Sequence, residues 1–420
     1  MKRFGLLAAA VFASVSFASL AEAATDLQMW YHGAGNEVEK KIIGQIIDDF
    51  NKSQSDWNVK LEQFPQAAYN DSVTAAALAG KLPDILDVDG PNMPNWAWSK
   101  YLQPLPLDEG LLKNFLPGPI GKWQGKIYSV GLWDAAIAIF ARKSVLDGNG
   151  IRIPTLDKPW TGEEFTAALK KIQASGKFDY PIDMGMAWKG EWYPYAFSPL
   201  MQSFGGDIVD RSTYKTAQKT LNGPEAVKFG QWWQSLFKDK LAPGTSEDPA
   251  LRDSGLLNGK FAMSWNGNWA ALGALDKFGK DLLFLPAPDF GKGPKIGAAS
   301  WQFGISATSK HADGAAAFIK FAIQDKYLTQ FSDGIGLIPS TPEAAKVSKN
   351  YAPGGAMEVF YSLSSKQGLV RPVTPGYVVE SKVFEKAVAD IADGADVQQT
   401  LDAAADEIDA DIKKNNGYGH

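Results

Sequence analysis

Residues 27–88 read LQMWYHGAGNEVEKKIIGQIIDDFNKSQSDWNVKLEQFPQAAYNDSVTAAALAGKLPDILDV. Three short segments of this stretch are apolar or alternate between apolar and polar residues, which predicts β-strands. The two longer segments between them have the periodicity of helices. Strands that alternate with helices form the parallel, doubly wound sheet of an α/β protein. In chain order we expect strand 27–31, helix 37–51, strand 56–64, helix 69–79 and strand 85–88.

Polar side chains follow two of these strands. His32 comes directly after the first strand, and Asp87 and Asp89 lie at the end of the third. In doubly wound sheets, ligands bind beyond the carboxyl ends of the strands. These three side chains are therefore predicted to face a ligand.

The chain is long enough for two domains. Some 397 of its 420 residues follow Ala23, which is more than a single core usually encloses. The apolar strand predicted at 135–141 follows Trp133-Asp134 and continues into residues 142–146 without a flexible linker. Extended chain at a domain boundary indicates a hinge rather than a tether. Further helices are predicted at 161–175, 224–240, 312–325 and 387–414, and further strands at 261–265 and 301–306.

Residues 1–23 have the pattern of a cleavable secretory signal peptide. Lys2-Arg3 form a positive start, residues 4–20 are mostly apolar and small, and Ala21-Glu22-Ala23 provide a small-x-small cleavage site. The chain contains no cysteine, which excludes disulfides, thiolate metal sites and a lipid-modified cysteine. Its formal net charge of -5 argues against a nucleic-acid partner, which requires a basic face.

Several kinds of catalytic and cofactor site are disfavoured. The chain has three histidines, His32, His311 and His420, and no two of them have the spacing of metal ligands. No serine lies in a nucleophile-elbow motif. The loop 33–36 lacks the third glycine of a dinucleotide fingerprint and the lysine of a P-loop. We therefore expect no metal and no cofactor.

Paired carboxylates leave one enzymatic alternative open. Glycoside hydrolases use two carboxyl groups on either side of the scissile bond. Asp87, Asp89, Asp134 and Glu191 all lie near predicted loops, with aromatic residues close by. Loop carboxylates also serve as turn formers and caps, and their spacing along the chain does not place two of them at a catalytic separation.

Aromatic residues recur next to hydrogen-bonding residues at predicted strand ends and loops. The chain has 14 tryptophans. A sugar ring has an apolar face that packs on an aromatic ring, while its hydroxyl groups need donors and acceptors. These pairs therefore favour a sugar ligand. They are Trp30/His32, Trp133/Asp134, Glu191/Trp192/Tyr193, Trp265/Asn266, Asn268/Trp269, Trp301/Gln302 and Arg371/Tyr377.

Five sequence blocks, in this order, resemble the extracellular solute-binding proteins of family 1. These maltose-binding-protein-like proteins are the sugar receptors of ATP-driven (ABC) importers. The resemblance covers essentially the whole chain after Ala23. The blocks are WYHG (30–33), AAALAGKLPDI (75–85), NGKFAMSWNGNW (258–269), GAASWQFGIS (297–306) and Arg371-Pro372.

The resemblance implies a type II periplasmic binding protein fold, in which two α/β lobes close over a ligand at the hinge. It implies lobes of 24–134 plus 295–330 and of 135–294 plus 331–420, each with a mixed, mainly parallel sheet. It also implies a non-catalytic monomer that delivers its ligand to a membrane permease. The cleft residues that it implies are His32, Gly33, Asp87, Asp89, Trp133, Asp134, Glu191, Trp192, Tyr193, Trp265, Asn266, Asn268, Trp269, Trp301, Gln302, Arg371 and Tyr377.

The leading hypothesis is a receptor for a saccharide or glycoside of mono- to trisaccharide size. Maltose itself is not expected, because His32-Gly33 stand where the maltodextrin receptors have a basic residue. An exported carbohydrate-active enzyme and an amino-acid or peptide receptor are the alternatives. Arg371 leaves an anionic glycoside open, unless it pairs with a carboxylate of the protein. An unanchored receptor needs a closed compartment, which indicates the periplasm of a Gram-negative bacterium.

Overall fold

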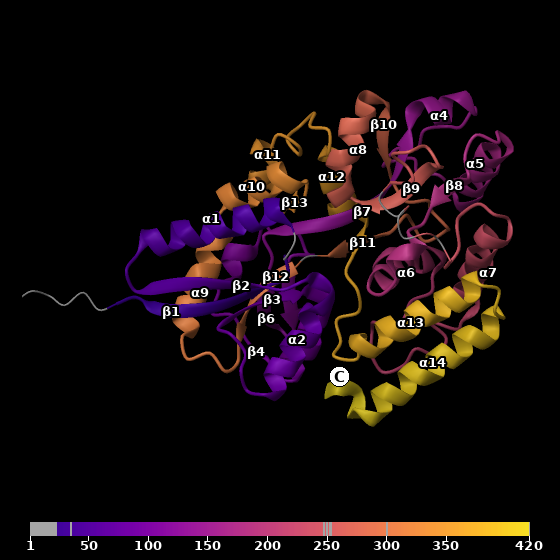
Figure 1. The fold of residues 1–420 in the computed structure, drawn as a ribbon. Helices are drawn as coiled ribbons and strands as arrows, with labels where there is room; N and C mark the ends of the chain where they lie inside the picture. Colours follow the sequence, from indigo (N-terminus) through magenta and orange to yellow (C-terminus); the bar gives the residue numbers. More distant parts are fainter. Residues whose placement is uncertain are drawn as a thin grey trace, which may run out of the picture.

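Two mixed β-sheets, each flanked by helices, divide the chain into two lobes (Figure 1). The computed structural model describes residues 23–33, 36–246, 248, 251, 254–299 and 301–419. Residues 1–22 of the predicted signal peptide therefore lie outside the described residues. Within the described part, no helix is long and apolar enough to cross a membrane.

The sheet of the first lobe has the strand order β2-β1-β3-β12-β6-β5, with β4 paired to β12. Strand β1 pairs in parallel with both β2 and β3, as the sequence predicts. The strand order reverses between β1 and β3, where doubly wound proteins bind ligands. The strands are β1 (Thr25–Tyr31), β2 (Trp57–Gln63), β3 (Ile85–Asp89), β4 (Leu102–Gln103), β5 (Ile120–Trp123), β6 (Lys126–Val130) and β12 (Trp301–Ser306).

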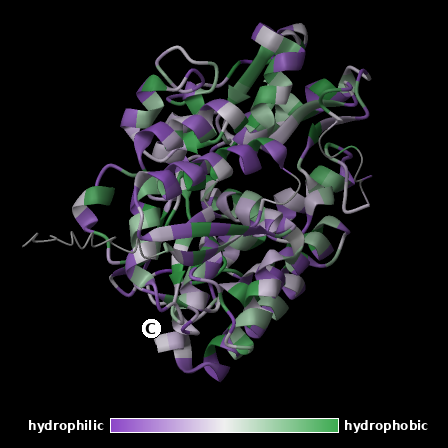
Figure 2. Cartoon of the chain, turned by 60° about the vertical axis from the view of Figure 1, so that its left-hand side comes forward, coloured by the Kyte–Doolittle hydropathy of each residue, from purple (hydrophilic) through white to green (hydrophobic). Residues whose placement is uncertain are grey.

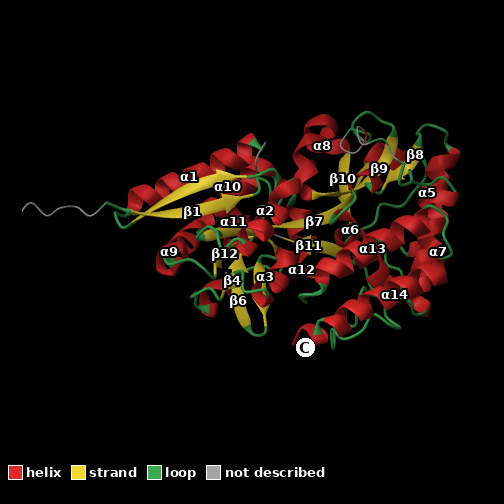
Figure 3. Cartoon of the chain, turned by 60° about the horizontal axis from the view of Figure 1, so that its bottom comes forward, coloured by secondary structure: helices red, strands yellow, loops and turns green. Residues whose placement is uncertain are grey.

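Helices cover both lobes from the outside. In Figure 3 the helices lie around the strands of each lobe. In Figure 2 hydrophobic and hydrophilic residues both occur along the outer helices, as expected of amphipathic helices that cover a core. Those of the first lobe are α1 (Glu37–Ser53), α2 (Gln66–Leu78), α3 (Met93–Trp98), α9 (Ala312–Ala322) and α10 (Asp325–Ile335).

The sheet of the second lobe has the order β14-β11-β7-β9-β8, and β10 and β13 also pair with β7. Its strands are β7 (Trp133–Arg142), β8 (Tyr180–Asp183), β9 (Phe261–Gly267), β10 (Leu282–Leu285), β11 (Ile296–Ala299), β13 (Ile338–Pro339) and β14 (Gly368–Leu369). Helix α11 (Pro342–Val347) packs against α10 of the first lobe. The remaining helices are α4 (Lys143–Gly148), α5 (Gly162–Ala174), α6 (Trp192–Phe204), α7 (Pro224–Lys238), α8 (Ala271–Phe278), α12 (Glu358–Gln367), α13 (Tyr377–Ala392) and α14 (Val397–Lys414).

The two-lobed α/β class is confirmed, but the sheets are less parallel than expected. Strand β7 is antiparallel to β9, β10, β11 and β13. Strand β12 is antiparallel to β3, β4 and β6. In each sheet these pairings involve the strand on which the chain arrives from the other lobe, β7 in the second sheet and β12 in the first, and this strand runs opposite to its neighbours. The strand-helix alternation at 27–88 is local to the first lobe and does not report these returning strands.

One lobe boundary also differs from the expected position. The sequence placed residues 295–299 in the first lobe, whereas β11 pairs with β7 and so belongs to the second sheet. The next strand, β12, pairs with β3 of the first sheet. The chain therefore crosses between the lobes after Ala299 rather than before Lys295.

Local signals set the ends of several helices. Asn36 caps α1 by accepting a hydrogen bond from the backbone N–H of Glu39 (3.1 Å). Thr161 and Glu164 form the capping box that begins α5, as the sequence pattern predicts. Both helices thus begin where a side chain satisfies backbone donors that would otherwise lack partners.

One buried carboxyl group has no compensating partner. Glu380 lies in the first turn of α13 and is 1 % exposed. Neither of its side-chain oxygens has a hydrogen-bond partner among the described residues. Burial is the main cause that raises the pKa of Glu380 to about 8, and Arg211 only partly offsets it. The folded state therefore holds a proton that the unfolded chain releases.

We expect Glu380→Gln to stabilise the protein at pH 8. The pKa of Glu380 rises from 4.5 to about 8 on folding, so the native protein loses stability as the pH rises through this window. The uncharged glutamine removes this loss, which should amount to at least about 1 kcal/mol at pH 8. Urea unfolding at pH 4.5, 6 and 8 measures the difference, which should shrink toward pH 4.5. The control is Glu407→Gln on the exposed face of α14. Parallel stability profiles for wild type and Glu380→Gln would contradict this account.

Candidate functional site

A cleft of about 550 Å³ lies between the two lobes. It begins beyond the carboxyl ends of β1 and β3, where the strand order of the first sheet reverses. Its volume is in the range of about 300–1,000 Å³ that is typical of small-molecule sites. The first lobe contributes five polar side chains to the lining, namely His32, Asn36, Glu39, Gln66 and Asp89, together with Trp301 and Ile335.

A hydrogen-bonded group holds the histidine of this wall in place. The His32 ring stacks on Trp301, with ring centres 3.7 Å apart and planes 8° from parallel. Nδ1 of His32 bonds to the Asp87 carboxylate, and Nε2 lies 3.8 Å from Oε1 of Glu39. The same Oε1 accepts a hydrogen bond from the Tyr31 hydroxyl (2.5 Å). The orientation of the ring is therefore fixed before any ligand arrives.

This group also decides the charge of the histidine. Burial by itself lowers the pKa of His32, but the Asp87 carboxylate and its hydrogen bond more than offset this, so the pKa is raised. Burial likewise raises the pKa of Asp87, against the opposing effect of His32. Asp87 is 1 % exposed and does not reach the cleft. It acts behind His32, as a positioning residue.

Asp89 is the carboxyl group of this wall with the most perturbed titration. It ends β3 and lies opposite Trp301 in the register of β3 and β12. Burial is the largest cause that raises the pKa of Asp89 to about 7; Glu191 raises it further, while Arg371 lowers it. Asp89 thus lies within the electrostatic reach of the opposite wall.

The second lobe supplies an aromatic wall. Trp188 and Trp192 have ring centres 4.6 Å apart, and Trp269 lies 5.7 Å from Trp188 and 6.1 Å from Tyr195. Gly267 makes room for this packing, because a Cβ there would lie 2.1 Å from the Trp269 ring. The four rings form a continuous apolar surface that faces the polar wall across the cleft.

An ion pair lies beside the aromatic wall. The Arg371 guanidinium donates to Oε1 of Glu191, and the Tyr377 hydroxyl donates to the same oxygen. The guanidinium carbon lies 5.1 Å from the centre of the Tyr195 ring. Burial raises the pKa of Glu191 in spite of the opposing effect of Arg371. Arg371 does pair with a carboxylate of the protein, one of the two roles that the sequence left open.

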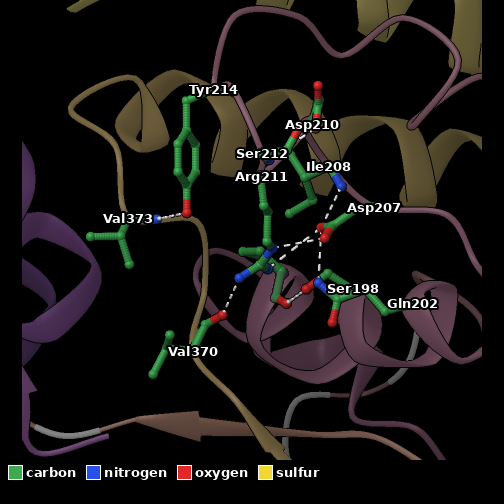
Figure 4. A network of polar contacts seen from close by, with 11 residues as sticks. Ser198, Gln202, Asp207, Ile208, Asp210, Arg211, Ser212, Tyr214, Val370 and Val373 are labelled. Carbon is green, nitrogen blue, oxygen red and sulfur yellow. Dashed lines mark hydrogen bonds and ion pairs between the residues drawn. The ribbon is translucent and has the colours of Figure 1, made fainter. Parts of the chain in front are cut away.

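The chain on either side of Arg371 is fixed to the second lobe (Figure 4). Arg211 donates to the carbonyl oxygen of Val370 (2.6 Å) and to Oδ2 of Asp207 (2.7 Å). The backbone N–H of Val373 donates to the Tyr214 hydroxyl (3.4 Å). These bonds fix the segment that carries Arg371 to the second lobe, where Arg371 lines the cleft.

Eight of the predicted site residues line the cleft. Their positions agree with the predicted sites, although their contact with a ligand stays a prediction. They lie at strand ends and in the segments where the sequence pairs an aromatic residue with a hydrogen-bonding one. The eight are His32, Asp89, Trp133, Glu191, Trp192, Trp269, Trp301 and Arg371.

Nine predicted residues lie outside the lining of the cleft, and their contact with a ligand also stays a prediction. Most are buried and bonded to the protein itself: the Asp134 carboxylate accepts from Ser364, Trp265 donates to Ala196, and the Tyr193 hydroxyl donates to Met186. The Asn266 side chain accepts from the backbone N–H of Gly267. Asn268 and Gln302 donate to the carbonyl oxygens of Gly336 and Gly118. The remaining three are Gly33, which packs on Tyr31, and Asp87 and Tyr377, which support His32 and Glu191.

Several lining residues were not predicted. Trp188 and Tyr195 flank the aromatic run at 191–193, and the three-residue spacing of Trp192 and Tyr195 puts both on one face of α6. That spacing was available in the sequence. Asn36 and Glu39 look like ordinary helix-capping residues, and no sequence signal separates that role from lining a cleft. The others are Gln66, Ala135, Leu272, Ile335 and Leu337.

A cleft of ligand size, lined by residues of two α/β lobes, is the arrangement of a two-lobed binding protein. No group of three or more histidine, cysteine, aspartate or glutamate side chains in the described chain could hold a metal ion. The family of bacterial extracellular solute-binding proteins matches this chain over residues 45–358, and the protein belongs to that family.

Individual relatives are distant but cover most of the chain. The chain is 24% identical over 318 residues to a multiple sugar-binding protein of Streptococcus mutans, covering 72% of each. It is 25% identical over 368 residues to an sn-glycerol-3-phosphate-binding periplasmic protein of Rhizobium meliloti, covering 79% of each. The structure of a cyclic alpha-maltosyl-1,6-maltose binding protein from Arthrobacter globiformis superposes with a TM-score of 0.77 at 21% identity, covering 93% of this chain and 100% of that one. The two-lobed fold of the family is therefore confirmed.

We expect Asp87→Asn to lower the pKa of His32 below its ordinary value of 6.5. Asp87 and its hydrogen bond are what raise this pKa against the effect of burial, so without the carboxylate the effect of burial prevails. NMR titration of the imidazole C–H signals measures the change, and a His32→Asn spectrum assigns the signal. The signal of His311, which lies at the start of α9, is the internal control. An unchanged titration of His32 would show that Asp87 does not determine its charge.

Proposed function

We propose that the protein binds a small saccharide or glycoside, of mono- to trisaccharide size, in the cleft between its lobes. It then presents this ligand to an ABC permease in the membrane. The observation that carries the proposal is a division of the cleft lining, in which four aromatic rings come from the second lobe and five hydrogen-bonding side chains come, with Trp301, from the first. A sugar ring has this same division between its apolar face and its hydroxyl edge.

Each wall has a separate part in binding. Trp188, Trp192 and Trp269 offer ring faces to the C–H face of a pyranose. Asp89 in the polar wall, and Glu191 beside the aromatic wall, offer carboxylate oxygens to its hydroxyl groups. Hydrogen bonds to charged acceptors contribute about 1.5–3 kcal/mol each. A few such bonds and one stacked ring account for micromolar affinity, roughly 8 kcal/mol.

Because the two walls belong to different lobes, ligand binding favours closure. A ligand shifts a conformational equilibrium only by the contacts that differ between the two states. A sugar that touches Trp269 of the second lobe and Asp89 of the first gains one set of contacts only when the lobes approach. The closed, loaded form is then the form that the permease recognises.

The setting of this function follows from the N-terminal sequence and the family. The family is extracellular, and we propose that residues 1–23 direct the chain to the periplasm and are then removed. With no cysteine in the chain, the receptor acts there as an unanchored protein, and as a monomer. A cleavage site at Ala23 can be checked by sequencing the N-terminus of the exported protein.

A carbohydrate-active enzyme is the second candidate, and one observation favours it. The pKa of Asp89, about 7, suits a general acid. The other carboxyl groups in the described lining are those of Glu39, which accepts from Tyr31 and Asn36, and Glu191, which accepts from Arg371 and Tyr377. This engagement of Glu191 makes binding without turnover the better account.

We expect Trp269→Ala to weaken sugar binding by about tenfold or more. Stacking on an aromatic ring contributes about 0.5–1.5 kcal/mol beyond the area that it buries, and about 1.4 kcal/mol corresponds to a factor of ten. A panel of mono- to trisaccharides, screened by thermal shift, identifies a ligand, and calorimetry then compares the variants. Trp57→Ala, on the far side of the first lobe near His311, is the matched control. Stabilisation by no sugar, or release of hydrolysis products, would contradict the proposed function.

A further inference from the structure

The cleft contains more negative than positive groups. Glu39, Asp89 and Glu191 contribute carboxyl groups to its lining, and Arg371 is the one lysine or arginine among the described lining residues. His32, the other basic residue there, is bonded to the Asp87 carboxylate. Any anion that enters the cleft therefore meets an excess of carboxylates.

The guanidinium of Arg371 already has a carboxylate partner within the protein. Arg371 donates to Glu191, and the side chains of the two residues are 6 % and 35 % exposed. Tyr377 donates to the same oxygen of Glu191, and the Tyr195 ring covers one face of the guanidinium. An anionic ligand that binds Nη1 of Arg371 has to displace a carboxylate that has two donors of its own.

From this arrangement we propose that the cleft excludes anionic glycosides and that Glu191 is the residue that determines this specificity. Glu191 neutralises Arg371 from within the protein, and the guanidinium then positions the Glu191 oxygens instead of binding an anion. The proposal rests on the proposed sugar-binding function and decides between the neutral and anionic ligands that the sequence left open.

Asp89 adds to the exclusion. Its carboxyl group lies in the wall opposite Glu191, and burial is the main cause that raises its pKa; Arg371 opposes this effect and Glu191 adds to it. A site that already disfavours ionisation of its own carboxyl group disfavours a further anion for the same reason. A neutral sugar, in contrast, brings hydroxyl donors to both carboxylates. Neutral ligands should therefore bind better than acidic ligands of the same shape.

The test compares sugars that differ only in charge. The pairs are glucose and glucuronate, galactose and galacturonate, and maltose and cellobiose with the disaccharides that carry a 6′-carboxylate. For each pair that binds, the wild type should bind the neutral member at least tenfold more tightly at pH 7.5. In Glu191→Gln, Arg371 is released, and this ratio should fall at least tenfold. Glu39→Gln removes an equal charge from the same cleft without touching Arg371, so the ratio should change less than threefold.

A second measurement does not depend on sugar binding. Acetate, titrated at constant ionic strength, should shift the NMR signal of the Arg371 Nε–H group in a saturable way in Glu191→Gln, and not in the wild type. Tighter binding of the acid by the wild type, or equal effects of Glu191→Gln and Glu39→Gln, would overturn the proposal. Binding of neither member of any pair, with the acetate result as expected, would contradict the sugar function and leave the role of Glu191 supported.

Discussion

Strand β7 is the element on which both lobes and the cleft depend. Its pairings with β9, β10, β11 and β13 make it the centre of the second sheet. The side chains of its first residues, Trp133 and Ala135, pack in the core of the first lobe. Residues 136–141 pack in the core of the second lobe. One extended strand thus enters two cores, and the cleft opens at the point where it passes from one to the other. Small side chains at 135 and 136 fit this crossing, because β11 pairs with β7 there.

The chemistry of the cleft depends on bonds far along the chain. Arg371 can pair with Glu191 because the segment around it is fixed by Arg211 and Tyr214 from a loop of the second lobe. Arg211 and Val370 are 159 residues apart in sequence. A similar long-range bond places His32, whose ring is held by Asp87 from β3. Both walls are therefore organised by the tertiary fold before a ligand binds, which reduces the entropy that binding would otherwise cost.

The sequence predicts the part of the site that depends on local structure. The strand-helix alternation of residues 27–88 places His32 and Asp89 at the ends of strands, and both line the cleft. The sequence does not predict the site residues near β9. All seven residues of that strand are buried, so no alternation of polar and apolar residues shows which side chains face a ligand. Trp265 and Trp269 belong to the same motif, yet Trp265 points into the core and bonds to Ala196. Trp269 lines the cleft because β9 ends at Gly267 and the chain then turns into a short 3-10 helix.

The same limit explains why the sequence could not decide what Arg371 does. Glu191 and Arg371 are 180 residues apart, and each has local neighbours that suit a ligand site. A buried cation requires a partner, since an unpaired charge in this setting is costly. The sequence shows that requirement but not the partner. The fold supplies Glu191. In the function that we propose, Arg371 then orients this carboxylate toward the hydroxyl groups of the ligand instead of binding an anion.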